Sequence, residues 1–152
     1  MRRREFITLL SGAASAWPLA SRAQQSAMPL IGYVSSQSPE STASYLDAFR
    51  TGLKQSGYIE GQNVAIEYRW GRGQFDAVPA LAAELAARRP AVIASTGGDP
   101  VAVAVKAAAP AIPIVFVIGD DPVEQGLVAG FNSPGGNVTG VTMLTLMLDA
   151  KR

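Results

Sequence analysis

Short apolar runs alternate with helix-length amphipathic segments along most of this chain. The runs have the length of strands, and the segments between them repeat apolar residues at spacings of three and four. This alternation predicts βαβ units, in which helices join parallel strands and cover both faces of the sheet. We therefore expect an α/β fold with strands at 30–34, 64–69, 91–95, 114–117 and 138–142, and helices at 39–56, 75–89, 100–109 and 123–129.

Three of the expected helices should start with a polar cap followed by proline. Ser38-Pro39, Asp99-Pro100 and Asp121-Pro122 each follow an expected strand. A serine or aspartate at the N-cap accepts hydrogen bonds from free N–H groups, and proline suits the first helical position. We expect all three caps at the carboxyl ends of strands.

The expected stripes of two helices also follow from spacing. Tyr45, Leu46, Phe49 and Leu53 should form the buried face of the first helix, and Phe75, Val78, Ala82 and Leu85 that of the second. The second helix should end at Arg88-Arg89, immediately before a proline.

Composition limits the chemistry that the chain can perform. Its 152 residues, 48% of them hydrophobic, suit one compact domain. The absence of Cys and His excludes disulfides, thiolate nucleophiles, imidazole bases and zinc-finger sites. Beyond the first 23 residues, nine basic side chains face eleven acidic ones, which disfavours nucleic acid as a partner. We expect no cofactor and no metal.

The N-terminus has the three regions of an export signal. Arg3-Arg4-Glu5-Phe6-Ile7 resembles the twin-arginine motif, an apolar run follows at 6–20, and Ser21-x-Ala23 offers small side chains for cleavage. The run is shorter than the ~20 residues that a membrane-spanning helix needs. We expect a twin-arginine signal peptide at 1–23 and a periplasmic mature protein. The alternative is an ordinary amphipathic first helix.

The strand order that we expect for such a doubly wound sheet, 2-1-3-4-5, creates a ligand crevice where the chain reverses between the first and third strands. Small polar loops flank this point. They favour a zwitterion or small carboxylate, because hydroxyls, glycine amides and a helix N-terminus suit an acid group and an aspartate suits an ammonium. The candidate ligand-binding residues are Ser35, Ser36, Thr96, Gly97, Gly98 and Asp120. For each hydroxyl alone, a plain loop or cap hydrogen bond is the alternative.

Enzymatic interpretations find little support in the same residues. The chain has no phosphate-binding Gly-x-x-x-x-Gly-Lys motif and no Gly-x-Gly-x-x-Gly after the first strand. A serine nucleophile would have no histidine as its base. Asp120-Asp121 suggests a magnesium site, but a turn and a cap are the commoner use of adjacent acids. We expect no catalytic residue; the alternative is a small exported α/β hydrolase or phosphatase.

Several stretches carry a family resemblance that covers nearly the whole chain. They include residues 31–36 (Ile-Gly-Tyr-Val-Ser-Ser), 61–70 (Gly-Gln-Asn-Val-Ala-Ile-Glu-Tyr-Arg-Trp), 113–117 (Pro-Ile-Val-Phe-Val) and 134–142 (Pro-Gly-Gly-Asn-Val-Thr-Gly-Val-Thr). The chain resembles the substrate-binding proteins of ABC importers, of the exported tryptophan/tyrosine type. The resemblance implies a type I periplasmic-binding-protein fold, whose two lobes close on a small molecule and present it to an ABC permease. It also implies ligand contacts at Ser35-Ser36, Thr96-Gly97-Gly98 and Gly119-Asp120.

Length is where the chain departs from that family. Its relatives continue into a second lobe, so we expect residues 24–142 to form the N-terminal lobe and 143–152 to begin the crossover. On this interpretation the chain is a truncated single lobe that need not bind a solute. The alternative is a one-lobe module reused for protein interaction.

Overall fold

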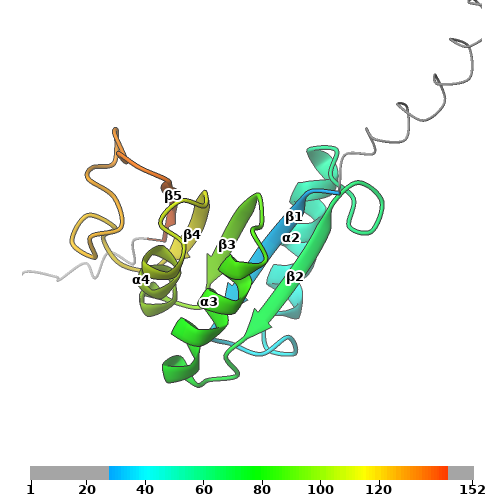
Figure 1. Ribbon diagram of the computed structural model, residues 1–152, viewed down its shortest axis with the longest axis horizontal. Coiled ribbons are helices and arrows are strands. Elements are labelled where there is room, and N and C mark those ends of the chain that lie inside the picture. The colour runs from blue at the N-terminus through cyan, green and yellow to red at the C-terminus, as the bar shows by residue number, and fades with distance from the viewer. Residues whose placement is uncertain (1–27, 144–152) are drawn as a thin grey trace, which may run out of the picture.

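All strands that the structure describes lie in one parallel sheet, with the order β2-β1-β3-β4-β5 (Figure 1). The computed structural model describes residues 28–143. The strands are β1 (Leu30–Ser35), β2 (Ala65–Trp70), β3 (Val92–Thr96), β4 (Ile114–Ile118) and β5 (Val138–Thr142). The predicted strand order 2-1-3-4-5 is confirmed, and the predicted strands agree with the observed ones to within a residue or so.

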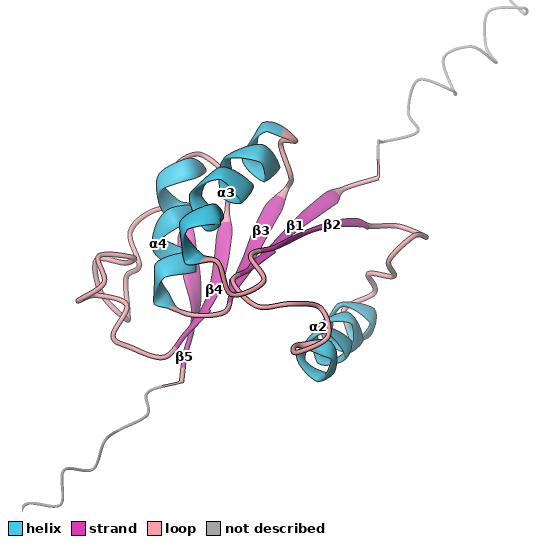
Figure 2. Cartoon of the chain, turned by 90° about the horizontal axis from the view of Figure 1, so that it is seen from below, coloured by secondary structure: helices cyan, strands magenta, loops and turns pink. Residues whose placement is uncertain are grey.

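Helices lie on both faces of the sheet, but unequally. The helices are α2 (Ala43–Gln55), α3 (Val78–Ala87) and α4 (Asp99–Ala108), and a short 3-10 turn, η1 (Phe75–Ala77), leads into α3. Figure 2 shows α3 and α4 side by side on one face and α2 alone on the other. Each helix connects two successive parallel strands, as in βαβ units: α2 joins β1 to β2, α3 joins β2 to β3, and α4 joins β3 to β4.

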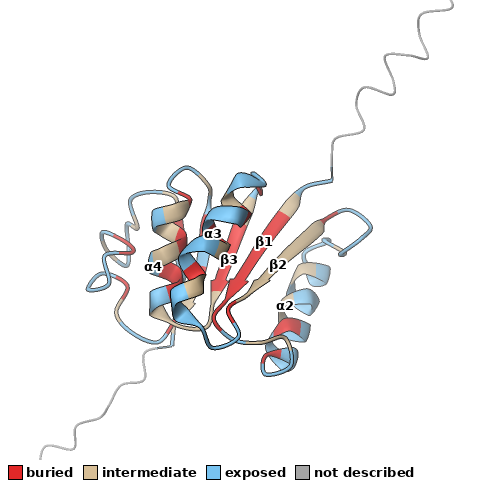
Figure 3. Ribbon diagram, turned by 60° about the horizontal axis from the view of Figure 1, so that its bottom comes forward, coloured by how far each residue is buried: buried red, intermediate tan, exposed pale blue. Residues whose placement is uncertain are grey.

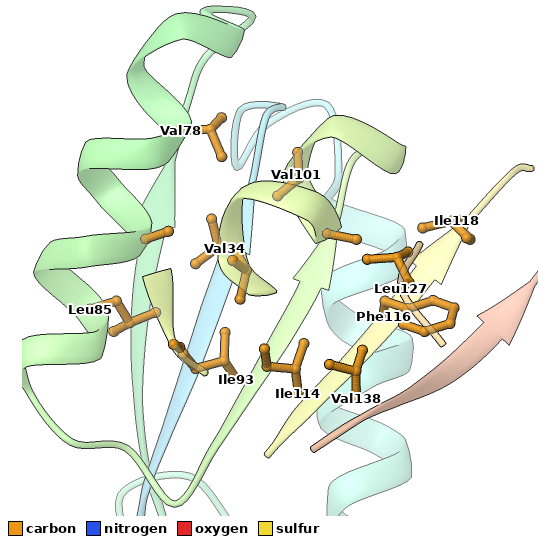
Figure 4. Packing of buried hydrophobic residues seen from close by; sticks show 14 of the residues in the cluster. Val34, Val78, Leu85, Ile93, Val101, Ile114, Phe116, Ile118, Leu127 and Val138 are labelled. Carbon is orange, nitrogen blue, oxygen red and sulfur yellow. The ribbon is translucent and has the colours of Figure 1, made fainter. Parts of the chain in front are cut away.

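The main core lies between the sheet and the α3–α4 layer. Leu85 of α3 and Val101 of α4 are fully buried against Val34 and Ile93 of the two central strands (Figure 4). β1 is buried along most of its length (Figure 3), as expected for a central strand covered on both faces. This packing fixes the strand ends that carry the candidate site.

The opposite face has a smaller aromatic cluster beneath α2. The Tyr33 ring lies 5.4 Å from that of Phe49, 5.6 Å from that of Tyr68 and 5.3 Å from that of Trp70. Towards β4 and β5 this face is more open, and Val115 and Val141 are 41% and 60% exposed. The α2 face is therefore packed over β1 and β2 more than over the rest of the sheet.

The first helix differs from the prediction at its start and on its face. It begins at Ala43 rather than Pro39, because Ser38 does not cap it: the Thr42 hydroxyl donates to the Ser38 carbonyl at 2.8 Å within a preceding turn. Tyr45 is 66% exposed, and Leu46 is the buried residue of this helix. The expected buried stripe was too wide, because α2 packs on the sheet along a narrow line.

The last predicted helix, 123–129, does not form. The Asp121 carboxylate accepts hydrogen bonds from the N–H groups of Val123 at 2.7 Å and Glu124 at 3.4 Å, so it does cap a turn. The chain then continues through hydrogen-bonded turns, with Gly126 at φ 67°. A left-handed glycine within the first turns stops a helix before it can propagate.

Two smaller corrections concern α3 and α4. Phe75 lies in η1 and is 50% exposed, whereas Val78 and Leu85 of the predicted stripe are buried. Gly98, not Asp99, occupies the N-cap position of α4, and Asp99 is the first helical residue. The Asp99 side chain instead accepts a hydrogen bond from the Gly119 N–H group at 3.1 Å.

The predicted signal peptide at 1–23 and most of the predicted crossover at 143–152 lie outside the described residues. Within residues 28–143, none of the helices has the length and apolar character needed to cross a lipid bilayer.

Candidate functional site

The loops that follow β1 and β3 are joined directly at the carboxyl edge of the sheet. Ser35 is in register with Thr96, so the two strands end side by side. One residue further on, the buried Ser36 hydroxyl donates to the Gly97 carbonyl at 2.5 Å. The two loops that the sequence placed around the crevice therefore form one rim.

The chain after β2 closes the other side of this rim through backbone hydrogen bonds. The Gly71 and Gly73 N–H groups donate to the carbonyls of Ser35 and Ser36, each at 2.7 Å. A Cβ on Gly71 would lie 3.1 Å from the Ser36 Cα, which shows how closely the two segments run. The rim is thus fixed by three neighbouring strands.

Glycine is required at the centre of the rim. Gly97 has φ 89°, and a Cβ there would lie 2.6 Å from the Ser36 Oγ and 2.8 Å from the Ser36 backbone nitrogen. Gly98, at φ 115°, is the N-cap of α4. The Gly97-Gly98 loop therefore brings bare backbone to the positive end of a helix, an arrangement that favours a negatively charged group.

Two cavities open on either side of Gly97. On the α2 side, a cavity of about 600 Å³ contains the Thr96 hydroxyl, which donates to the Tyr33 hydroxyl at 3.0 Å. Its lining is mostly aromatic and small: Tyr33, Gln37, Thr42, Tyr45, Phe49, Thr96, Gly97, Gly98, Val117 and Met143. On the other side, a cavity of about 370 Å³ is polar and cationic: Ser36, Gln37, Ser38, Ser41, Arg72, Gly73, Phe75 and Gly97.

Asp120 lies at the same edge of the sheet but borders a different hollow. It lines, together with Asp99, a groove of about 800 Å³ along the outer side of α4. A hydrogen bond with Asp99 and the negative charge of that neighbour raise the pKa of Asp120 above its ordinary value. Asp120 is therefore separated from the two cavities at Gly97 by the first residue of α4.

The structure thus brings together most of the residues singled out in the sequence. Thr96 and Gly98 line the larger cavity, Ser36 lines the smaller one, and Gly97 borders both. The Ser35 side chain is fully buried, and its Oγ accepts a hydrogen bond from the Gln37 N–H group at 3.2 Å. Ser35 therefore holds the loop rather than facing the cavities.

Sequence reasoning missed the side chains that shape these cavities. Tyr33 alternates with the buried Val34 and so faces α2, a position that the two-residue period of a strand does predict. Arg72 stands between two glycines directly after β2, and this Gly-Arg-Gly sequence indicates a tight turn of the kind that places Arg72 in the left-handed region. Tyr45 and Phe49 had been assigned to a helix stripe, but both line the larger cavity.

The described part of the chain offers no metal site. Between residues 28 and 143, no three His, Cys, Asp or Glu side chains are grouped so that they could hold an ion. The side chains around the two cavities offer hydrogen bonding, aromatic contact and the positive charge of Arg72, and the Asp99–Asp120 pair lies beside them at the neighbouring groove.

Comparison with known proteins identifies relatives that bind small molecules. The family described as ABC transporter substrate binding protein matches residues 31–150. A tyrosine-binding protein from Clostridioides difficile is 31% identical over 94 residues, which cover 62% of this chain and 27% of the relative.

Solved structures with the same fold point in the same direction. The ligand-free, open structure of a substrate-binding protein with adhesive properties from Clostridium difficile aligns with a TM-score of 0.69 and 25% identity, over 75% of this chain and 38% of that one. An ABC domain from Streptococcus pneumonia in complex with L-Trp aligns with a TM-score of 0.69 and 26% identity, over 76% and 39% of the two chains. This chain therefore spans well under half the length of its relatives, and the shared region corresponds to one lobe.

Proposed function

Because the chain belongs to the family of ABC transporter substrate-binding proteins, we propose that its sheet edge forms half of a receptor site for a small amino acid in solute import. The observation that carries this proposal is the rim at Gly97, where two loops expose backbone amides and a helix N-terminus beside an aromatic cavity. Such a site suits a ligand that is anionic at one end and apolar at the other.

The solute class follows from the two kinds of lining. The Gly97-Gly98 amides and the hydrogen-bonded hydroxyl pair of Thr96 and Tyr33 suit a carboxylate, because this pair has one proton to donate. Tyr45 and Phe49 suit an aromatic or aliphatic side chain. The names of two relatives agree, since one is a tyrosine-binding protein and another holds L-Trp. We assign this chain the same class, an aromatic amino acid or a similar small carboxylate.

The six candidate residues take different parts in this proposal. Thr96, Gly97 and Gly98 contact the acid group of the solute, and Ser35 and Ser36 hold the loops that present them through hydrogen bonds to the Gln37 N–H group and the Gly97 carbonyl. Asp120 provides negative charge near the ammonium group, from the far side of the α4 N-terminus.

The cellular setting is part of the same proposal. A chain that serves an ABC importer binds solute outside the cytoplasm and passes it to a permease, and it needs no catalytic group. The twin-arginine segment at 1–23 would be the export signal, cleaved in the periplasmic protein.

Binding of amino acids to the purified chain tests the proposal. Isothermal titration with L-tyrosine and L-tryptophan should give saturable binding that Thr96→Val weakens, because the variant removes a polar contact at the rim. Thr51→Val, which changes an exposed residue of α2, is the matched control and should bind as the parent does. Absence of binding by the parent to a panel of all common amino acids would refute the proposed function.

A further inference from the structure

The smaller cavity at the rim has a cationic wall that the family resemblance did not indicate. It lies between the loop after β1 and the turn Gly71-Arg72-Gly73, and its volume is about 370 Å³. Arg72 is its charged lining residue, and Gly97 forms the border with the larger cavity.

Backbone hydrogen bonds hold Arg72 beside this cavity. Its N–H group donates to the Gln37 carbonyl at 3.2 Å, and the glycines on both sides of it bond to the same loop. Arg72 itself has φ 50°, in the left-handed region that residues other than glycine seldom adopt. Such outliers are concentrated at functional sites, where the surrounding structure enforces them.

The guanidinium of Arg72 is not engaged in an ion pair within residues 28–143. Arg50 pairs with Glu60 at 2.7 Å and Arg88 with Glu67 at 2.9 Å. Arg69 also pairs with Glu67, at 3.4 Å, whereas Arg89, like Arg72, forms no ion pair within this range. The charge of Arg72 is felt by the exposed Glu40 carboxylate. Hydrogen bonds from Ser38 and from the backbone of Glu40 lower the pKa of Glu40, and the charge of Arg72 lowers it to a smaller extent.

The hydroxyl protons in the cavity are mostly committed elsewhere. Ser36 donates to the Gly97 carbonyl, and Ser41 donates to the Ser38 carbonyl at 3.0 Å. Arg72 and the exposed Gln37 carboxamide are therefore the principal donors for an incoming anion.

We propose that Arg72 selects solutes with a free carboxylate, binding that group at the Gly97 border between the two cavities while the rest of the solute lies in the aromatic cavity. This inference rests on the proposed function and adds a specificity-determining residue to it. A guanidinium matches a carboxylate better than an ammonium does, because it can donate two parallel hydrogen bonds.

Three variants and three probes test this. Arg72→Gly removes the guanidinium, and glycine readily adopts the left-handed backbone at this position. Arg72→Lys keeps the positive charge. Arg89→Gly is the control: it replaces the other left-handed arginine, at φ 54°, which follows α3 at the opposite edge of the sheet. The probes are L-tyrosine, L-tyrosinamide and sodium acetate. In L-tyrosinamide an amide replaces the carboxylate of L-tyrosine. Titration calorimetry measures the first two, and NMR amide shifts of residues 36–38 report acetate.

Arg72→Gly should weaken L-tyrosine binding about tenfold and leave L-tyrosinamide binding unchanged. It should also abolish the acetate shifts, with Arg72→Lys intermediate and Arg89→Gly like the parent. Raising the salt concentration should weaken L-tyrosine binding in the parent more than in Arg72→Gly.

The two proposals fail in different ways. Parent-like L-tyrosine affinity in Arg72→Gly would overturn the role of Arg72 while the proposed function stands. Acetate shifts that depend on Arg72, without binding of any amino acid, would support the anion site and refute the proposed function. A parent that shows neither L-tyrosine binding nor acetate shifts would overturn both.

Discussion

Gly97 is the residue on which the geometry of the rim most depends. An alanine there combines a left-handed backbone with a Cβ 2.6 Å from the Ser36 Oγ, so Gly97→Ala should destabilise the fold by about 1–3 kcal/mol and abolish solute binding. Chemical denaturation and titration calorimetry measure the two effects. Gly126→Ala is the control, because Gly126 also has positive φ but a Cβ there meets nothing within 4 Å. Equal losses in the two variants would contradict the steric explanation.

Ser95 is a buried polar residue without a partner. It is 1% exposed, and within residues 28–143 its hydroxyl is the one buried side-chain group that has no hydrogen-bond partner. Burying an unsatisfied hydroxyl is costly, so Ser95→Ala should be neutral or stabilise the fold by up to about 1 kcal/mol. Urea unfolding measures this. The comparison is Ser36→Ala, which breaks the bond to Gly97 and should lower stability; a clear loss in Ser95→Ala would reveal a partner for that hydroxyl.

Asp120 should make stability depend on pH in a defined direction. Because Asp99 raises the pKa of Asp120 in the folded state, the folded chain holds this proton more tightly than the unfolded chain does. Stability is then lost as pH rises from the ordinary aspartate pKa through the raised one. Asp120→Asn should therefore gain stability relative to the parent at neutral pH and not at pH 3. Thermal melts across this range check it, and a difference independent of pH would exclude the Asp99 interaction as the cause.

At this scale the sequence predicted residue types better than side-chain directions. Thr96, Gly97 and Gly98 could be placed at the edge because they follow a strand and precede a helix. The face of Ser35 follows from the strand period, because Ser35 lies two residues after Tyr33, but its complete burial depends on the loop after β3 that packs against it. The position of Arg72 depends on backbone hydrogen bonds to the loop after β1, which local spacing does not predict.

At the scale of elements, strands were more predictable than helix starts. β1, β3 and β4 are largely buried apolar runs bounded by polar loops, so hydrophobicity marks their limits. β2 is half-buried and alternates apolar with polar residues, and β5 is mostly exposed, so these two follow from alternation and composition instead. Ser38-Pro39 has the composition of a helix start, but a serine-based turn uses the same donors and acceptors and forms there instead. The same competition between turn and helix explains why no helix forms at 123–129. The Asp121 carboxylate accepts hydrogen bonds from the same N–H groups whether the chain forms a turn or begins a helix.

The end of α3 offers a stabilising substitution. Arg89 follows the C-cap Arg88 in a left-handed conformation and precedes Pro90, a position that glycine fills most easily. Arg89→Gly should raise the free energy of unfolding by about 0.5–1 kcal/mol, because relief of the left-handed strain outweighs the greater entropy of glycine in the unfolded chain; urea denaturation measures it. Arg88→Gly, at a right-handed position and within an ion pair to Glu67, should lower it. A loss in both variants would contradict the conformational explanation for Arg89.

At the scale of the whole molecule, the alternation of apolar runs and amphipathic segments determined the architecture. It predicted a parallel sheet covered on both faces, for which 2-1-3-4-5 is a common strand order, and that order is the one observed. It did not predict how unevenly the two faces are covered. Two helices pack against one face, whereas α2 alone lies on the other (Figure 2). Val115 and Val141 remain exposed.

The carboxyl edge of this sheet is where the family membership and the geometry meet. The most direct test of the account is an NMR titration of the isotope-labelled chain with L-tyrosine and L-tryptophan. We predict saturable shifts of backbone amides in residues 35–38 and 96–99, with little change at the amino edge around Arg89. Saturable shifts centred elsewhere, or none at all, would contradict the claim that this edge receives a small amino acid.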